Sequence, residues 1–184
     1  KDKVIKSNKN LDISLKKVKL TLDPFKFKLN AKTVGAIIYY SKRPLILEHV
    51  KTQVSIDSFF KNKLVSSNFE VATRSILVKD LVKFIRAITN KPELLILETL
   101  IKNGHVILDL NLNFDQNGKI KSDYEINGLL KGGKIKFLKK IDFKNIDFLF
   151  NIKKENFLIK DIKFTTDKVN FTSNLIKFVK IDND

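Results

Sequence analysis

Hydrophobic and polar residues alternate with a period of two along most of this chain. In residues 104–128 the apolar positions share one parity and are Val106, Leu108, Leu110, Leu112 and Phe114, followed after a turn by Ile120, Tyr124 and Ile126. Successive side chains of a strand point to opposite faces, so the pattern predicts two strands with one apolar and one polar face. Asn117-Gly118 between them favours the positive φ angles of a hairpin turn.

The same alternation predicts strands in most other parts of the chain, at residues 11–15, 18–22, 25–32, 34–40, 45–56, 69–73, 134–138, 146–152, 157–164 and 169–181. Parity slips at Lys16-Lys17 and Lys160-Asp161 are typical of β-bulges, which keep the apolar side chains on one face. Phe25 and Phe27 alternate with lysines and predict an aromatic inner face. Residues 128–133 are predicted to be a connection, and residues 57–61 one helical turn.

Helical periodicity appears only in the middle of the chain. The apolar residues after Ser75 follow the i, i+4, i+7, i+8, i+11 spacing of an amphipathic helix, at Leu77, Leu81, Phe84, Ile85 and Ile88. Pro92 interrupts this pattern, and residues 93–102 are predicted to form a second helix. We therefore predict one β-rich domain over residues 1–184, with a first sheet segment at 1–75, a helical insertion at 76–103 and a second sheet segment at 104–184.

The predicted fold class is mostly β, an antiparallel meander of about eleven strands with two short helices between its halves. Eleven strands at ~4.8 Å spacing make a sheet roughly 50 Å wide, which must curl, fold into a sandwich or be covered. An open sheet would expose about 600 Å² of apolar surface, the size of a binding site. The two helices can cover only part of it. Alternation alone favours the ordinary core of a closed sandwich, whereas a groove would be completed by a ligand.

Composition adds a basic charge but no clear partner. The net charge is +16, a value compatible with nucleic acid or an anionic membrane. Only three of the 36 basic residues are arginine, and lysine, asparagine, isoleucine and phenylalanine dominate, as in proteins from AT-rich genomes. Specific phosphate recognition favours arginine, so the composition argues against a specific nucleic-acid site. The chain starts at Lys1 and contains no methionine, and we expect it to be a piece of a longer protein.

No catalytic motif is present, and we do not expect an enzyme, a cofactor or a metal site. His49 and His105 are the only histidines, there is no cysteine, and neither histidine adjoins a carboxylate cluster. Gly132-Gly133-Lys134 lacks the rest of a phosphate-binding loop. No segment has the ~18 apolar residues of a membrane helix.

Several segments resemble the AsmA-like family of bacterial envelope proteins (the AsmA/TamB/YhdP type). They are LKKVKLTLDPFKFKLNAKTV, RPLILEHVKTQVSIDSFF, INGLLKGGKIKF and FNIKKENFLIKDIKF, and the resemblance extends over most of residues 11–181. It is a resemblance of strand and turn pattern, without an invariant motif. It implies a long β-groove, apolar inside, of the kind found in bridge-like lipid-transfer proteins.

The resemblance implies a segment that holds phospholipid acyl chains for transport between the inner and outer membranes of a Gram-negative bacterium. The implied partners are phospholipid or another acyl lipid and further copies of the same groove. The implied location is the periplasm, with an inner-membrane anchor outside residues 1–184. The alternative is a structural or adhesive β-sandwich module with a closed core. The predicted lipid-binding residues are Phe25, Phe27, Val106, Leu108, Leu110, Leu112, Phe114, Ile120, Tyr124, Ile126, Ile146, Phe148 and Phe150.

Overall fold

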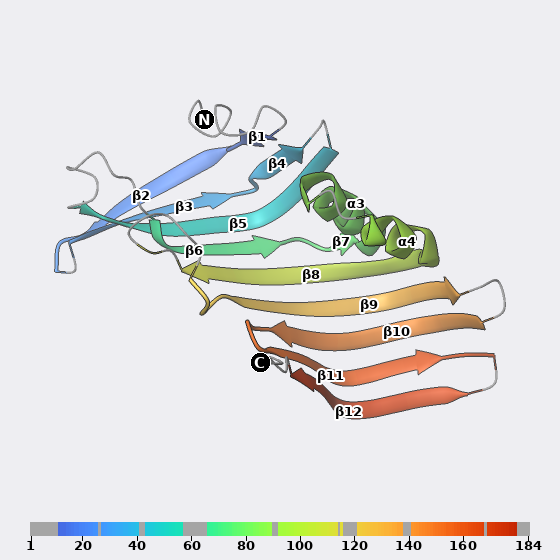
Figure 1. The fold of residues 1–184 in the computed structure, drawn as a ribbon. Helices are drawn as coiled ribbons and strands as arrows, with labels where there is room; N and C mark the ends of the chain where they lie inside the picture. The colour runs from blue at the N-terminus through green and yellow to red at the C-terminus, as the bar shows by residue number, and fades with distance from the viewer. Residues whose placement is uncertain are drawn as a thin grey trace.

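A computed structural model describes residues 11–25, 27–40, 43–56, 66–89, 92–113, 115, 121–137, 141–167 and 169–179. Twelve strands in these ranges form one sheet, and two helices, α3 (Val78–Thr89) and α4 (Glu93–Leu100), lie beside it (Figure 1). The strands are β1 (Leu11–Ser14), β2 (Lys17–Asp23), β3 (Lys28–Val34), β4 (Ile37–Tyr40), β5 (Arg43–Ser55), β6 (Ser66–Thr73), β7 (Ile76–Leu77), β8 (Ile101–Asn113), β9 (Glu125–Phe137), β10 (Ile141–Ile152), β11 (Asn156–Thr165) and β12 (Asn170–Val179).

From β8 to β12 each strand pairs with the next one in sequence, whereas the N-terminal strands include skipped pairings, and every pair is antiparallel. The main order is β1-β4-β5-β6-β8-β9-β10-β11-β12, with β2 on β3, β3 on β5 and β7 on β8. β5 is long enough to pair with β4 at its start and with β3 at its end. In the described residues β1 and β2 form one edge, β12 forms the other, and no pairing closes the sheet. The predicted curved antiparallel meander with two short helices is confirmed.

The two predicted sheet segments join directly. β6 pairs with β8 from Asn68↔Asn113 to Ala72↔Asp109, so the helices between them lie off the sheet rather than dividing it. In Figure 1 the sheet twists from β1 and β2 at the top to β12 at the bottom, and the helices stand beside β7 and one end of β8. The described residues contain no second sheet facing the first, so they do not form the closed sandwich that was the alternative.

The prediction that residues 128–133 form a connection is wrong, because these residues lie in the middle of β9. Glycines in a strand often mark close packing or a bulge. A Cβ on Gly128 would lie 2.1 Å from Cζ of Phe150, and one on Gly133 would lie 2.9 Å from Cβ of Ile146. Both glycines therefore make room for side chains of β10.

The β8–β9 connection is also longer than the predicted hairpin turn. β8 ends at Asn113 and β9 begins at Glu125, and the Lys121 N–H donates a hydrogen bond of 2.8 Å to the Asn113 carbonyl oxygen. Most of the predicted turn, like the helical turn predicted at residues 57–61, lies outside the described residues.

Candidate functional site: the inner face of the sheet

One face of the sheet is apolar from edge to edge. Directly opposed residues of neighbouring strands point to the same face, so the pairing register shows which side chains lie together. From β6 to β12 one row of opposed residues is Val71, Leu110, Ile126, Ile152, Phe157 and Phe178. From β2 to β8 a second row is Leu20, Ala31, Thr52, Phe69 and Leu112. We call this surface the inner face.

Most of the predicted lipid-binding residues belong to the inner face. The register places there Val106, Leu108, Leu110 and Leu112 of β8, Ile126 of β9, and Ile146, Phe148 and Phe150 of β10. Tyr124 is half-buried and directly precedes β9, two positions before Ile126 and therefore with the same side-chain parity. Phe114 and Ile120 lie outside the described residues. Lipid binding by these side chains remains a prediction.

Phe25 and Phe27 do not lie in the strand predicted for them. They are 94% and 68% exposed and belong to the loop between β2 and β3, which closes at the pair Asp23↔Lys28. Phe27 has φ +48°, a left-handed value that takes it out of the alternating strand geometry. The alternation that begins at Phe25 becomes a real strand only from Lys28 onward, where Leu29 and Ala31 join the inner face.

Two rows of phenylalanine rings cross the C-terminal strands of the inner face, and sequence reasoning left most of them out of the site. The first row joins Phe148, Phe150, Phe157 and Phe178, with centroid distances of 5.9, 6.5 and 5.7 Å. The second joins Phe143, Phe164 and Phe171, at 5.5 and 4.7 Å. The strand alternation in residues 141–178 was the signal that could have identified them.

Bulges keep these rows on one face. Gly132 of β9, Asn145 of β10 and Asp161 of β11 all have positive φ, from +52° to +61°. The register shifts lie on either side of Ile146 in the β9–β10 pair and on either side of Asp147 in the β10–β11 pair, and they match bulges, which reverse the side-chain parity. Apolar residues on both sides of the bulges therefore face the same way, as the slip at Lys160-Asp161 predicted.

A carboxylate fixes this irregular region. Asp147 accepts a 2.7 Å hydrogen bond from the Gly132 N–H and forms a 2.9 Å ion pair with Lys131. Partial burial acts to raise the pKa of Asp147, but these two bonds outweigh it and hold that pKa below its usual value. The ionised form of Asp147 is therefore the one that stabilises the turn of the backbone at Gly132.

Helices α3 and α4 cover one end of the inner face. α3 packs against β4, β5, β7 and β8, and α4 against α3, β8 and β9. The largest group of buried apolar side chains lies here: Ala36, Leu47, Val82, Phe84, Ile101 and Val106. Arg86 of α3 and Glu98 of α4 join the two helices through contacts of 3.1 Å. The rest of the inner face in the described residues has no element above it.

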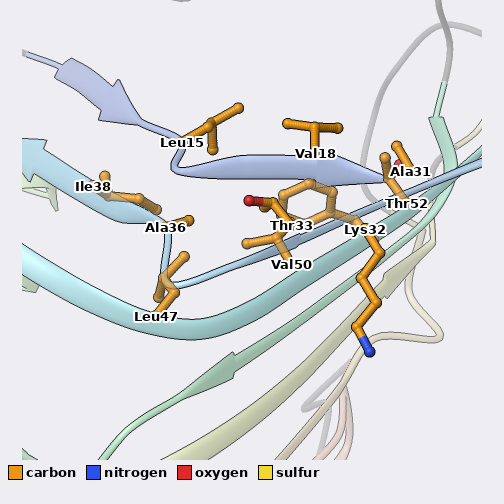
Figure 2. Close-up of a pocket in the computed structure, with 11 residues that line it drawn as sticks. Leu15, Val18, Ala31, Lys32, Thr33, Ala36, Ile38, Leu47, Val50 and Thr52 are labelled. Atoms are coloured by element: carbon orange, nitrogen blue, oxygen red, sulfur yellow. The ribbon is translucent and has the colours of Figure 1, made fainter. Parts of the chain in front are cut away.

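A cavity of about 220 Å³ lies at the boundary between the covered and the open parts. Its lining comes from β2 to β6 and from the connections that hold Leu15 and Ala36. It is apolar apart from two threonines and one lysine: Leu15, Val18, Ala31, Lys32, Thr33, Ala36, Ile38, Leu47, Val50, Thr52 and Phe69. Figure 2 shows the Lys32 side chain running away from the other labelled residues. The cavity is thus an apolar hollow in the inner face.

The opposite face, which we call the outer face, is largely polar. Asn68 donates hydrogen bonds to the side-chain oxygens of Asn111 and Asn113, at 2.8 and 3.0 Å. Asn151 donates in the same way to Glu125 and Asn127, at 2.6 and 2.7 Å. The bond from Asn151 lowers the pKa of Glu125 despite some desolvation, and Lys153 lowers it further. The outer face also carries apolar residues, which include Ile107, Leu129 and Leu149.

Comparison with known proteins returns no relative. No protein-family model matches the chain, and neither a curated protein nor a solved structure matches it. No helix within the described ranges is long and apolar enough to cross a membrane. The same residues contain no cluster of three or more metal-ligating side chains. The function must therefore be argued from the inner face itself.

Proposed function

We propose that this chain is a segment of a bridge-like lipid-transfer protein and that its inner face holds the acyl chains of phospholipids. The observation that carries the proposal is that the described residues form one unclosed sheet with a continuous apolar face, of which their helices cover only one end. Soluble proteins rarely leave such a face in contact with water, and an exposed apolar surface of this extent usually binds a partner.

The inner face stays apolar up to both edges of the sheet. On β2 the exposed fractions of Val18, Leu20 and Leu22 are 48%, 60% and 61%, and on β12 Phe178 is 53% exposed. These residues lie in the same rows as the half-buried residues of the central strands. A bound acyl chain would cover them, which is why we assign the ligand to this face and not to the helices.

Burial of an acyl chain on the inner face would provide enough free energy for binding without any directional bond. Burial of a methylene group contributes ~0.8 kcal/mol, so a 16-carbon acyl chain gains on the order of 12 kcal/mol relative to water. The two phenylalanine rows offer similar contacts from β10 to β12 and no directional bond. A chain held in this way resists escape into water but can shift along the face, as transfer requires.

In the full proposal the lipid moves between the inner and outer membranes of a Gram-negative envelope. The chain would lie in the periplasm, continued by further copies of the groove and anchored to the inner membrane by a segment outside residues 1–184. Lipid headgroups would remain at the wet margin of the inner face, because charged groups lose too much hydration energy on an apolar surface.

The proposal is tested by extracting and weighing the lipid that copurifies with the chain, using a pair of variants on one strand. Phe178→Lys and Leu175→Lys both introduce a charge on β12, at positions 53% and 55% exposed. Phe178 pairs with Phe157 on the inner face, and Leu175 pairs with Lys160 on the outer face. We expect wild type and Leu175→Lys to retain bound phospholipid and Phe178→Lys to lose most of it. Equal lipid content in the two variants, or none in wild type, would refute the proposal.

A further inference from the structure

A polar hollow lies at the end of β9 and β10 that is opposite the helices. Its volume is about 390 Å³, and it lies where the starts of β9 and β11 meet the end of β10. The helices stand at the other end of these strands, because β8 begins where α4 ends and Ile101 pairs with Ile135 near the end of β9 (Figure 1). The residues that line the polar hollow are Ser122, Asp123, Tyr124, Glu125, Lys153, Lys154, Glu155 and Asn156.

The polar hollow adjoins the inner face through Tyr124. This residue lines the hollow, is half-buried and has the side-chain parity of Ile126, which pairs with Ile152 on the inner face. From Glu125 to Ile135 the strand rises about 30 Å at ~3.3 Å per residue, whereas one acyl chain needs ~15 Å, half of a bilayer core. An acyl chain on the inner face of β9 and β10 can therefore place its headgroup in the polar hollow.

Carboxylates and ammonium groups share the polar hollow, and they are only partly paired with each other. Glu125 Oε1 lies 3.4 Å from Nζ of Lys153, and Asp123 accepts a 3.1 Å hydrogen bond from the side-chain amide of Asn113. Lys154 and Glu155 are exposed, and their side chains form no hydrogen bond or ion pair among the described residues. The polar hollow thus offers an ammonium group and carboxylates that a ligand can reach.

This mixture of charges limits the class of ligand. A simple anion such as phosphate would meet Lys154 but also the carboxylates of Asp123 and Glu155, and a simple cation would meet the lysines. A ligand that carries a phosphate and an ammonium group two carbons apart has a partner for each sign. A primary ammonium group also donates charge-assisted hydrogen bonds to carboxylates, whereas a quaternary ammonium group has no N–H to donate.

We propose that the polar hollow binds the phosphoethanolamine headgroup of a phospholipid, with the phosphate on Lys154 and the ammonium group on Asp123 and Glu155. The acyl chains of the same lipid pass Tyr124 and lie on the inner face. This inference rests on the proposed function and adds to it a preference for a zwitterionic phospholipid with a primary amine.

The test compares three soluble phospholipids that differ only in the headgroup. The dihexanoyl forms of phosphatidylethanolamine, phosphatidylcholine and phosphatidylglycerol are titrated, below their micelle concentrations, into the full chain by calorimetry. We expect the ethanolamine form to bind about fivefold more tightly than the glycerol form, the effect of one well-placed exposed ion pair, and more tightly than the choline form. In the chain labelled with ¹³C-tyrosine, the ring signals of Tyr124 should shift and those of Tyr39 on β4 should not.

Two variants and two matched controls separate the polar hollow from the net charge. Glu155→Gln should lower the preference for the ethanolamine form to about twofold. Lys154→Gln should weaken the ethanolamine and glycerol forms alike, because both carry a phosphate. Glu93→Gln on α4 and Lys79→Gln on α3 make the same charge changes on exposed side chains near the other end of β8 and should leave all three affinities unchanged.

Four outcomes would overturn the inference. Equal binding of all three phospholipids to wild type would refute the headgroup site while leaving the proposed function intact. Equal binding of the ethanolamine and choline forms alone would refute the primary-amine preference. Free phosphoethanolamine that binds as tightly as the lipid would assign the polar hollow to a soluble ligand. A failure of all three phospholipids to bind would refute the proposed function and, with it, the headgroup site.

Discussion

The contact between Gly128 and Phe150 offers a sharp test of how the inner face is built. Gly128 of β9 pairs with Phe150 of β10, and a Cβ at position 128 would lie 2.1 to 2.7 Å from Cζ, Cε1 and Cε2 of the ring. Real Cβ atoms do not approach so closely, so Gly128→Ala must displace the ring. Phe148 and Phe157 lie on either side of it, at centroid distances of 5.9 and 6.5 Å.

Overpacking of this kind costs about 1–3 kcal/mol, and the lower chain entropy of alanine returns up to about 1 kcal/mol. We therefore expect Gly128→Ala to lower the free energy of unfolding by about 1–2 kcal/mol. In a chain of 184 residues this loss corresponds to roughly 2–8 °C in Tm. Guanidinium denaturation followed by circular dichroism gives the free energy directly.

A double-mutant cycle identifies the ring as the cause. Phe150→Leu removes the distal ring atoms, so the same Gly128→Ala change should be close to neutral in that background. The coupling free energy should then be about as large as the cost in wild type. If Gly128→Ala costs the same in both backgrounds, the ring does not lie over Gly128 and the described packing of β9 on β10 is wrong.

Three further predictions concern single groups. Thr33→Val should raise the free energy of unfolding by about 1 kcal/mol, because it removes a buried hydroxyl group that has no hydrogen-bond partner among the described residues. Thr52→Val should lower the free energy of unfolding, because it removes a hydroxyl group that makes a hydrogen bond. Chemical denaturation of both variants checks these two changes. Asp147 has a depressed pKa in the folded state, so its contribution is present above the ordinary value of 3.8 and is lost as the pH falls through the folded value. The stability deficit of Asp147→Asn should therefore shrink in denaturation curves measured at progressively lower pH, and a constant deficit would contradict the assignment. Arg86→Ala and Glu98→Ala should show a coupling of about 0.5–1 kcal/mol in a double-mutant cycle, and additive effects would mean that the ion pair does not hold α4 to α3.

Period-two alternation predicted the sheet well because the inner face is almost uniformly apolar. Residues 146–152 and 157–164 lie in β10 and β11 with the predicted faces, and the slip at Asp161 is a left-handed residue, as a bulge requires. The helical stripe predicted at residues 77–88 lies in α3 from Val78 onward, although its first residue, Leu77, belongs to β7. In each case the periodicity of the segment agrees with the face that it packs against the rest of the protein.

Predictions from the sequence were wrong or incomplete where a contact with another strand determines the local structure. Gly128 and Gly133 resemble a flexible connection in isolation, and only the side chains of β10 explain why a strand needs glycine there. Phe25 and Phe27 continue an alternating pattern that the β2–β3 loop interrupts. The unpaired Thr33 hydroxyl was equally invisible, because only the strand pairing shows that the residues opposed to Thr33, Val18 on β2 and Val50 on β5, offer it no side-chain acceptor.

The central claim, that the inner face and not the outer face holds acyl chains, can be measured with one tryptophan at a time. The chain contains no tryptophan, so Phe148→Trp and Leu149→Trp each introduce a single fluorophore, on the inner and outer faces of β10 respectively. Phospholipid with brominated acyl chains quenches tryptophan only on close contact. We predict strong quenching of Phe148→Trp and little of Leu149→Trp. Equal quenching of the two variants, or none of either, would contradict the claim.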